Sequence, residues 1–377
     1  MRAVIWGVVL VLIAGAAALA DSATNEIDSY VQQQLVARHV PGMSVGVLKA
    51  GKVVLAKGYG LANVELEVAA TADTVYGLMS TSKQFLAAAV LLLVNQGKLG
   101  LNDSVTKYLT DAPAAWKGVT LHHLLAHTSG IPDYTGVQGF FANMRVDATP
   151  EQLIAPVESE PLLFTPGTGW RYSNSNYYLL GMMVEKVSGM SLAAFLTERL
   201  FQPLGMSQTR LNDLRDVIAN RASGYQWIGE NIDRPPPMVT GYHGRKNVLQ
   251  NAVYISPTRL WAAGGVVSSV NDLIKWEQAL AGGKLLGTRT VEMMSQPVVL
   301  NNGKQADYGY GNELGQIKGH HFAGHQGSGV GFNAALLRLV DDHMTVIVLC
   351  NQTTAPSLPI AMHIAGMYVA DLRGVVK

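Results

Sequence analysis

The chain has 377 residues, of which 48% are hydrophobic and 15% charged, so it can bury a large core and is too apolar to be disordered. Its 28 Lys and Arg residues balance 27 Asp and Glu residues, which excludes the concentrated basic face that a nucleic-acid backbone requires. The single Cys350 cannot form an internal disulfide, and its apolar neighbours predict a buried, inert thiol.

Residues 1–20 have the pattern of a secretory signal peptide. Arg2 supplies a positive charge, residues 4–18 are an uncharged apolar run, and Ala18-Leu19-Ala20 ends the run with small residues at the spacing of a cleavage site. An uncleaved anchor helix is the alternative, because the run is nearly long enough to span a bilayer. We expect cleavage, which leaves residues 21–377 as a periplasmic or secreted protein without stable membrane insertion.

Two hairpins are predicted, one near each end of the mature chain. Residues 43–48 and 53–58 are apolar runs joined by a short turn, in which Gly51 can adopt a positive φ. Residues 332–338 and 345–349 repeat this pattern. Strands are therefore expected at both ends of the chain.

The middle of the chain, roughly residues 99–281, is richer in helix and loop. Gly189 has the position of a residue that ends a helix, and Ser191 and Ser269 have the position of N-caps. Residues 358–372 repeat at helical spacing. We expect an α/β body built from both ends of the chain, with a mostly helical subdomain inserted at 99–281, working as one catalytic unit.

A serine and a lysine stand at the amino end of a predicted buried helix. Residues 86–94 are apolar on every side, which is typical of a core helix. Ser80 and Lys83 are three residues apart and share one helical face, so the amine can approach the hydroxyl. A serine nucleophile needs such a base, and a helix amino terminus favours a developing anion. A solvent-facing lysine beside an N-capping serine is the alternative.

Tyr172 and Asn174 follow a turn at residues 165–169, on a predicted loop that faces a cleft. A phenol can act as a base only where a cation stabilises its phenolate, and Lys83 would be such a cation. The Asn174 amide could orient a substrate carbonyl or the lysine.

Residues 324–331 are rich in glycine, which lets a backbone and a ligand approach each other closely. This segment does not match Gly-x-Gly-x-x-Gly, so we exclude a dinucleotide fingerprint. Ser80 lacks the flanking glycines of Gly-x-Ser-x-Gly, which excludes an α/β-hydrolase.

Histidine spacing gives little support for a metal site. His123 and His127 are four residues apart without the glutamate of His-Glu-x-x-His. His320, His321 and His325 are close together, but no carboxylate motif accompanies them in the sequence. We expect structural or site-lining histidines, and neither a metal nor a cofactor.

Ser80-x-x-Lys83, Tyr172-x-Asn174 and His325-x-Gly327 occur in the order and approximate spacing of penicillin-recognising serine hydrolases. The chain resembles the branch that contains class C β-lactamases, D,D-peptidases and family VIII esterases. Leu-Leu-Ala-His-Thr-Ser-Gly at 124–130 supports this, and the resemblance covers nearly all of the mature chain. It implies a β-lactamase/transpeptidase-like fold, in which helices flank an antiparallel sheet and a mostly helical subdomain is inserted.

The resemblance also implies roles for individual residues. Ser80 would be the acylated nucleophile, and Lys83 and Tyr172 would transfer protons, either of them being a candidate for the acylation base. Backbone N–H groups of Ser80 and Ser328 would form the oxyanion hole. The implied substrate-binding positions are Asn174, His325, Gly327 and Ser328.

The pocket strand departs from class C β-lactamases, which carry Lys-Thr-Gly where this chain has His325-Gln326-Gly327. Without that lysine a substrate carboxylate loses a binding group, so we expect weak β-lactamase activity at most. The expected substrate is a small ester, an amide or a D-amino-acid peptide, selected by loops near residues 132–134 and 234–244. A true β-lactamase, a D-aminoacyl or D,D-peptidase, and a β-lactam sensor that is acylated only once remain open alternatives.

Overall fold

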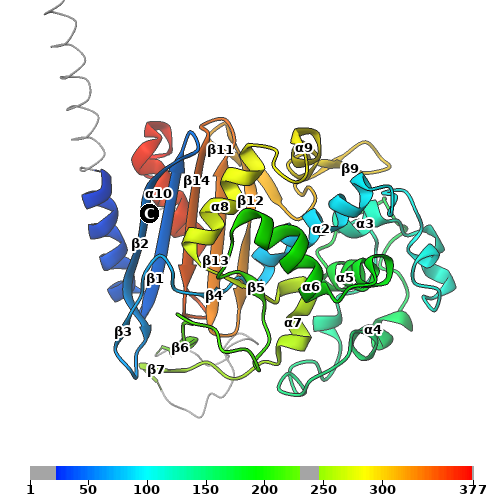
Figure 1. The fold of residues 1–377 in the computed structure, drawn as a ribbon, viewed down its shortest axis with the longest axis horizontal. Helices are drawn as coiled ribbons and strands as arrows, with labels where there is room; N and C mark the ends of the chain where they lie inside the picture. The colour runs from blue at the N-terminus through cyan, green and yellow to red at the C-terminus, as the bar shows by residue number, and fades with distance from the viewer. Residues whose placement is uncertain (1–22, 230–245, 376–377) are drawn as a thin grey trace, which may run out of the picture.

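A seven-stranded antiparallel sheet organises the protein, whose computed structural model describes residues 23–229 and 246–375 (Figure 1). The strand order is β11-β12-β13-β14-β1-β2-β3, so strands from the two ends of the chain pair as β14 and β1. The predicted signal peptide, residues 1–20, and the whole predicted loop at 234–244 lie outside the described residues. The strands are β1 (Gly42–Lys49), β2 (Lys52–Asn63), β3 (Val68–Ala69), β11 (Glu313–Ile317), β12 (His320–Gly329), β13 (Phe332–Leu339) and β14 (Met344–Cys350).

Alternate residues of the central strands face two different hydrophobic cores. In β14, Val346 and Val348 pack towards the helix of residues 23–37 and α10 (Ser357–Tyr368). Ile347 and Leu349 face the opposite side, where they join the core formed by the helices from the middle of the chain. Figure 1 shows the first helix in blue and α10 in red on one side of the sheet, with α8 on the other. Because both of their faces are buried, the central strands β1 and β14 are mostly apolar.

The predicted elements at both ends of the chain are present. The hairpins form as β1–β2 and β13–β14, and the apolar segment near the carboxyl end forms α10. Gly46 in β1 lets α8 lie on the sheet, since a Cβ there would come within 2.7 Å of Val270 Cγ1. Cys350 is buried in β14, and burial raises the pKa of its thiol.

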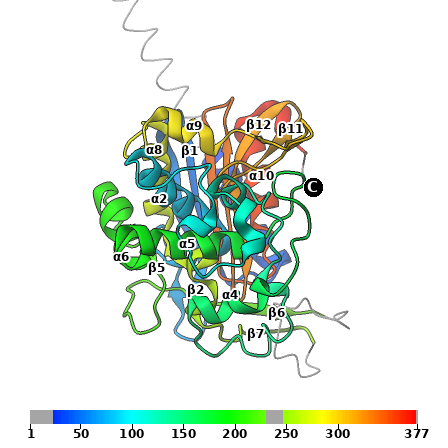
Figure 2. The ribbon, with the colours of Figure 1, turned by 90° about the vertical axis from the view of Figure 1, so that its right-hand side faces the viewer.

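Helices cover the inner face of the sheet, and α5 crosses the molecule on that side (Figure 2). These elements are α2 (Lys83–Asn95), α3 (Leu121–Leu125), α4 (Pro150–Glu158), α5 (Asn174–Ser188), α6 (Leu192–Leu196), α7 (Pro257–Gly264), α8 (Val270–Ala281) and α9 (Thr288–Met294). Short strands accompany them: β4 (Tyr76–Gly77), β5 (Arg210–Leu211), β6 (Tyr225–Ile228), β7 (Val248–Asn251), β8 (Val266–Ser268), β9 (Val298–Val299) and β10 (Gln305–Ala306). Four of these strands, β5 to β8, lie within residues 99–281.

The predicted helix caps are confirmed. Gly189 ends α5 with a φ of 70°, a conformation that glycine adopts without a Cβ clash. The Ser191 and Ser269 side chains accept hydrogen bonds from backbone N–H groups of the first turns of α6 and α8. These caps fix where the helices begin and end.

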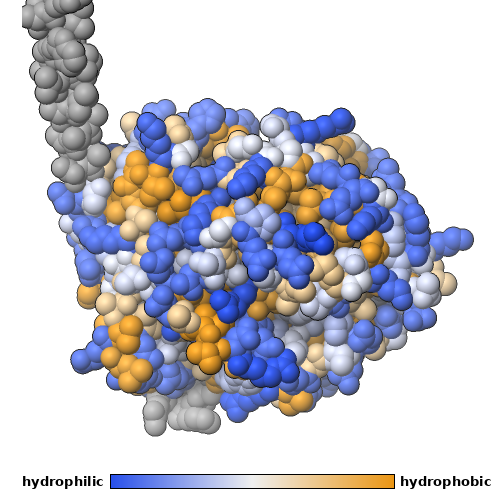
Figure 3. Space-filling model, viewed as in Figure 1, coloured by the Kyte–Doolittle hydropathy of each residue, from blue (hydrophilic) through white to orange (hydrophobic). Residues whose placement is uncertain are grey.

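Helix α2 is buried on nearly all sides, as its composition predicts. Within the described residues no single helix has the length and apolar composition to cross a membrane; α5 and the segment 192–204, bent by 81°, meet that test only as a pair. On the face seen in Figure 3, hydrophobic residues form small groups between hydrophilic ones.

Candidate active site

Ser80 lies in the short 3-10 turn η1 (Met79–Ser82), directly before α2. Strand β12 passes very close to this turn. A Cβ on Gly327 would lie 2.0 Å from the Leu78 carbonyl oxygen and 3.0 Å from the Ser80 nitrogen, so only glycine fits. The Thr81 hydroxyl donates to the His325 carbonyl at 3.2 Å and ties the turn to the same strand. The glycine-rich segment therefore lines the nucleophile.

Lys83 is fully buried at the start of α2, so the alternative of a solvent-facing lysine is wrong. Its Nζ donates to Ser80 Oγ at 3.2 Å. It also donates to Asn174 Oδ1 at 2.8 Å and to the Ala263 carbonyl at 2.7 Å. Three acceptors thus surround an amine that has lost its water, and they aim it at the serine.

Burial lowers the pKa of Lys83 to about 7, although the carboxylates of Asp133 and Glu313 oppose this shift. Near neutral pH a large fraction of the amine is therefore uncharged. An uncharged amine has a free lone pair and can accept the proton of a serine hydroxyl.

Tyr172 approaches the serine from another side, and its hydroxyl donates to Ser80 Oγ at 2.8 Å. Burial raises the pKa of this phenol, and the hydrogen bond to Ser80 only partly opposes the shift. The Lys83 Nζ lies 4.8 Å from the centre of the ring. Because burial outweighs these effects, the phenol stays protonated, and it is a better proton donor than base in the free protein.

Asn174 is the first residue of α5 and not part of the loop that the sequence predicted. Its Oδ1 accepts from Lys83, and its Nδ2 donates to Asp133 Oδ2 at 3.0 Å. The amide thus links the amine to a carboxylate. No sequence motif points to Asp133, although it lies in one of the loops expected to select the substrate.

His325 lies on β12 with its ring buried. Its Nδ1 is 2.5 Å from the Gln326 carbonyl oxygen, and its Nε2 is 3.0 Å from the Tyr308 hydroxyl. Burial, together with the charge of Lys83, lowers the pKa of His325 to about 3. The imidazole is therefore neutral and does not replace the cation that Lys-Thr-Gly supplies.

In the folded chain each of the three neighbouring histidines lies within 4 Å of a carboxylate. His325 Nδ1 lies 3.7 Å from Glu313 Oε1. The partners of His320 and His321, at 2.9 Å each, are Asp342 and Asp341. Sequence spacing could not show this, because neighbouring strands and turns supply the acids. Burial raises the pKa of Glu313 to about 7.

His127, for which the sequence predicts a structural or site-lining role, is fully buried beside Tyr172. The two ring centres are 4.4 Å apart. His127 Nδ1 lies 3.0 Å from Asn176 Nδ2 and 3.3 Å from the Ser173 nitrogen, so it is held as an acceptor. The ring supports Tyr172 from behind, a role that the motif at 124–130 alone did not reveal.

A cavity of about 150 Å³ opens beside Ser80, Asn174 and Ser328. Its apolar walls come from Tyr134, Phe140, Phe141, Ile255, Leu260 and Val330. None of the described residues that line it is a lysine or an arginine. The cavity suits an uncharged, apolar group next to the nucleophile.

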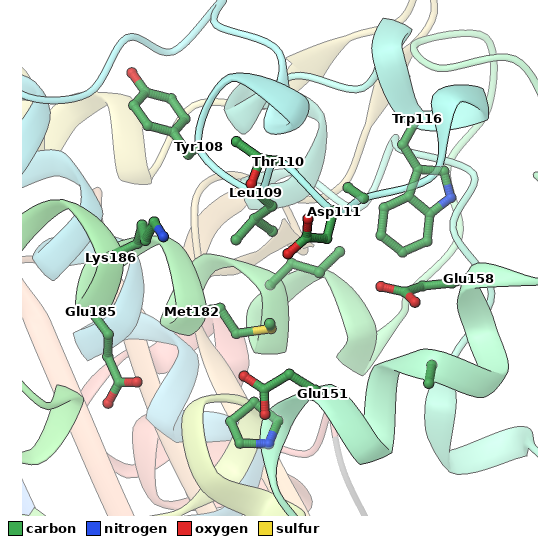
Figure 4. A pocket seen from close by; sticks show the side chains of 14 residues that line it. Tyr108, Leu109, Thr110, Asp111, Trp116, Glu151, Glu158, Met182, Glu185 and Lys186 are labelled. Atoms are coloured by element: carbon green, nitrogen blue, oxygen red, sulfur yellow. The ribbon is translucent and has the colours of Figure 1, made fainter.

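A larger cavity of about 520 Å³ lies elsewhere in the helical region, among α4, α5 and residues 108–116 (Figure 4). The carboxylates of Asp111, Glu151 and Glu158 turn towards it, and burial together with Asp111 raises the pKa of Glu158. It contains none of the predicted site residues. Size alone therefore does not identify the site.

The predicted site residues are brought together around one serine. Lys83, Tyr172 and Asn174 are joined to Ser80 by direct or shared hydrogen bonds, and Gly327 and Ser328 line it from β12. The Ser328 side chain itself points away to accept from Asn333 Nδ2 at 3.1 Å. A hydroxyl between an amine and a phenol is the arrangement of an activated serine nucleophile.

Comparison with known proteins agrees with this geometry. The model of the family described as Beta-lactamase matches residues 27–367. Penicillin-binding protein 4* of Bacillus subtilis (strain 168) is 32% identical over 333 residues, which cover 84% of this chain and 69% of that protein. Protein flp of Staphylococcus aureus (strain COL) is 33% identical over 217 residues, 56% of this chain and 43% of that protein, so the match spans less than half of it.

Two solved structures show the likeness in three dimensions. The octameric penicillin-binding protein homologue from Pyrococcus abyssi has a TM-score of 0.78 and 29% identity, covering 92% of this chain and 77% of its own. The D-amino acid amidase from Ochrobactrum anthropi SV3, complexed with L-phenylalanine amide, has a TM-score of 0.79 and 23% identity, covering 93% and 99%. At 23% identity, the similarity to the amidase shows a shared fold.

Proposed function

Because this chain belongs to the Beta-lactamase family of serine hydrolases, we propose that it cleaves esters or amides through an acyl-enzyme formed on Ser80. One observation carries the proposal: Ser80 Oγ is held between Lys83 Nζ and the Tyr172 hydroxyl. This arrangement also favours turnover over a sensor that is acylated once, because the groups needed to activate a second nucleophile, water, are in place.

In acylation, uncharged Lys83 accepts the Ser80 proton while Oγ bonds to the substrate carbonyl carbon. Backbone N–H groups of Ser80 and Ser328 then bind the oxyanion, and losing one such donor typically costs about 100- to 1000-fold in rate. When the C–O or C–N bond breaks, the leaving group takes the Tyr172 proton, and the Lys83 ammonium reprotonates the phenol. Water repeats the sequence on the acyl ester and releases the acid and Ser80, so one water is consumed.

The charges around the serine oppose substrates with a carboxylate. Asp133 brings a carboxylate close to the site, and Glu313, whose pKa burial raises to about 7, is partly ionised near neutral pH. His325 is neutral, and burial leaves Lys83 only partly charged. β-Lactams carry a carboxylate, so weak β-lactamase activity at most is proposed.

Asp133 supports a second candidate, hydrolysis of D-aminoacyl amides or peptides. Its carboxylate hydrogen-bonds Asn174 and Thr135 but forms no ion pair with any cation in the described ranges. It could therefore pair with the ammonium of an aminoacyl substrate.

A substrate panel tests the proposal. The mature protein is assayed with p-nitrophenyl butyrate, D-phenylalanine amide, L-phenylalanine amide and nitrocefin. We expect steady ester turnover, D-amide cleavage faster than L-amide cleavage, and slow nitrocefin hydrolysis. Fast nitrocefin turnover would favour a true β-lactamase, and one stoichiometric burst without turnover on any substrate would favour the sensor.

The pH dependence of kcat/KM for the neutral ester should report Lys83. Only the uncharged amine accepts a proton, so kcat/KM should reach its full value above about pH 7 and fall as the pH drops below that value. The Glu313 carboxylate raises the Lys83 pKa, so Glu313→Gln should move this limb to lower pH without removing it. A limb that disappears in Glu313→Gln would assign the titration to Glu313 instead. The measurement is kcat/KM of the wild type and of Glu313→Gln between pH 5 and 9.

Export belongs to the same proposal. The charge of Arg2, the apolar run and the small residues at 18–20 support removal of residues 1–20 and a periplasmic or secreted location. The rest, 21–377, would form one catalytic unit with a helical insert at 99–281. Amino-terminal sequencing of the exported protein would identify the cleavage site.

A further inference from the structure

A second cavity of about 290 Å³ adjoins the cavity beside Ser80. The residues that line both cavities are Met79, Ile255, Leu260 and Val330. The second cavity extends between residues 252–255, which follow β7, and Gly77 and Val267 of β4 and β8. Its walls are mostly apolar. The two cavities therefore adjoin, and the first of them begins at the nucleophile.

A cation stands in the wall of the second cavity. Arg221 is half-buried there, and its guanidinium donates to Asn212 Oδ1. Across the ranges 23–229 and 246–375 no carboxylate forms an ion pair with Arg221. Asp216 and Arg210 act on it only from a distance: Asp216 raises its pKa and Arg210 lowers it. Burial lowers the pKa of Arg221, but guanidinium remains charged at any physiological pH. An unpaired cation in an apolar wall is suited to bind an anion.

The position of the proton donor decides which part of a substrate enters these cavities. The leaving group must receive the Tyr172 proton, so it lies on the side of Tyr172 and His325. Neither of these is among the described residues that line the two cavities. The cavities therefore receive the acyl part, whose carbonyl carbon bonds to Ser80.

We propose that the acyl site takes an extended apolar chain with an anion at its far end, which runs from Ser80 past Leu260 and Val330 to Arg221. A monoester or monoamide of a long dicarboxylic acid has this chemistry. The inference rests on the proposed function, because it requires an acyl group on Ser80. It also separates two positions for negative charge: a carboxylate near the serine is opposed, whereas one at the end of the chain is bound.

Three esters with the same leaving group test the inference: p-nitrophenyl acetate, p-nitrophenyl octanoate and the mono-p-nitrophenyl ester of suberic acid. Octanoate and suberate have equal chain lengths and differ only in the terminal carboxylate. We expect kcat/KM to rise from acetate to octanoate, by up to about fourfold for each methylene that becomes buried. The suberate ester should exceed the octanoate ester by about tenfold or more, as expected of a charge-assisted hydrogen bond.

Two variants and a matched control locate the effect. Arg221→Met should remove the preference for suberate and leave acetate unchanged. Arg215→Met is the matched control, because it removes a positive charge from a nearby side chain that is 88% exposed. It should change the turnover of none of the three esters. Val253→Trp narrows only the second cavity, so it should slow octanoate and suberate but not acetate.

The outcomes separate this inference from the proposed function. Acetate turnover without any gain for octanoate or suberate would overturn the extended site and leave the serine hydrolase intact. An equal loss of suberate and octanoate turnover in Arg221→Met would show that the arginine acts on the structure and does not bind the anion. No hydrolysis of any ester, acetate included, would overturn both.

Discussion

Replacing Ser80 with Ala should reduce ester turnover by about 10⁴-fold or more and abolish the covalent adduct. Ser80 Oγ accepts hydrogen bonds from both Lys83 Nζ and the Tyr172 hydroxyl. Without it the amine and the phenol have no nucleophile to activate, and only background catalysis by the oxyanion hole remains. Turnover is measured with p-nitrophenyl butyrate, and the adduct by intact-protein mass spectrometry with a slowly released acyl group.

Ser82→Ala is the matched control, because it removes a second hydroxyl from the same 3-10 turn. The Ser82 side chain accepts from the Val266 nitrogen at 3.0 Å and takes no part in the proposed chemistry. It should lower the thermal stability, since a buried N–H loses its acceptor, and keep the adduct. An adduct that persists in Ser80→Ala would move the nucleophile to another residue.

Replacing Lys83 with Met should lower kcat/KM by about 10³- to 10⁴-fold, because acylation loses its base. The fold should survive, since methionine has a similar length and removes a buried amine that lost its hydration on folding. Lys83→Arg separates two roles of the amine. Arginine keeps the positive charge but cannot release its proton, so it should be about as inactive as methionine.

Activity in Lys83→Arg close to the wild-type rate would show that charge, and not proton acceptance, is what the site needs.

Tyr172→Phe gives the complementary comparison. It removes the proposed proton donor and leaves the base, so a smaller loss of about 10²-fold is expected, greatest for amides, whose leaving group most needs a proton. Turnover of anilide and p-nitrophenyl ester substrates distinguishes these cases, with circular dichroism as the check on folding.

The site could be predicted from the sequence only where its residues share a local element. Ser80 and Lys83 occupy adjacent turns, so a spacing of three was enough to place the amine near the hydroxyl. Asp133 and His127 lie in the loop that follows α3 and Glu313 lies in β11, and no spacing relates them to the serine. Their contributions, a carboxylate on Asn174, a ring behind Tyr172 and a charge near Lys83, exist only after folding.

The two terminal hairpins, the buried helix α2, the caps at Gly189, Ser191 and Ser269, and the pairing of Ser80 with Lys83 could be predicted from local patterns. These features follow from periodicities and cap chemistry that act over a few residues. The protonation of the site, in contrast, depends on tertiary packing. Burial lowers the pKa of Lys83 to about 7, keeps Tyr172 protonated and keeps His325 neutral, because removing water penalises the charged form of each group. Desolvation depends on what packs from all sides, and no local pattern records it.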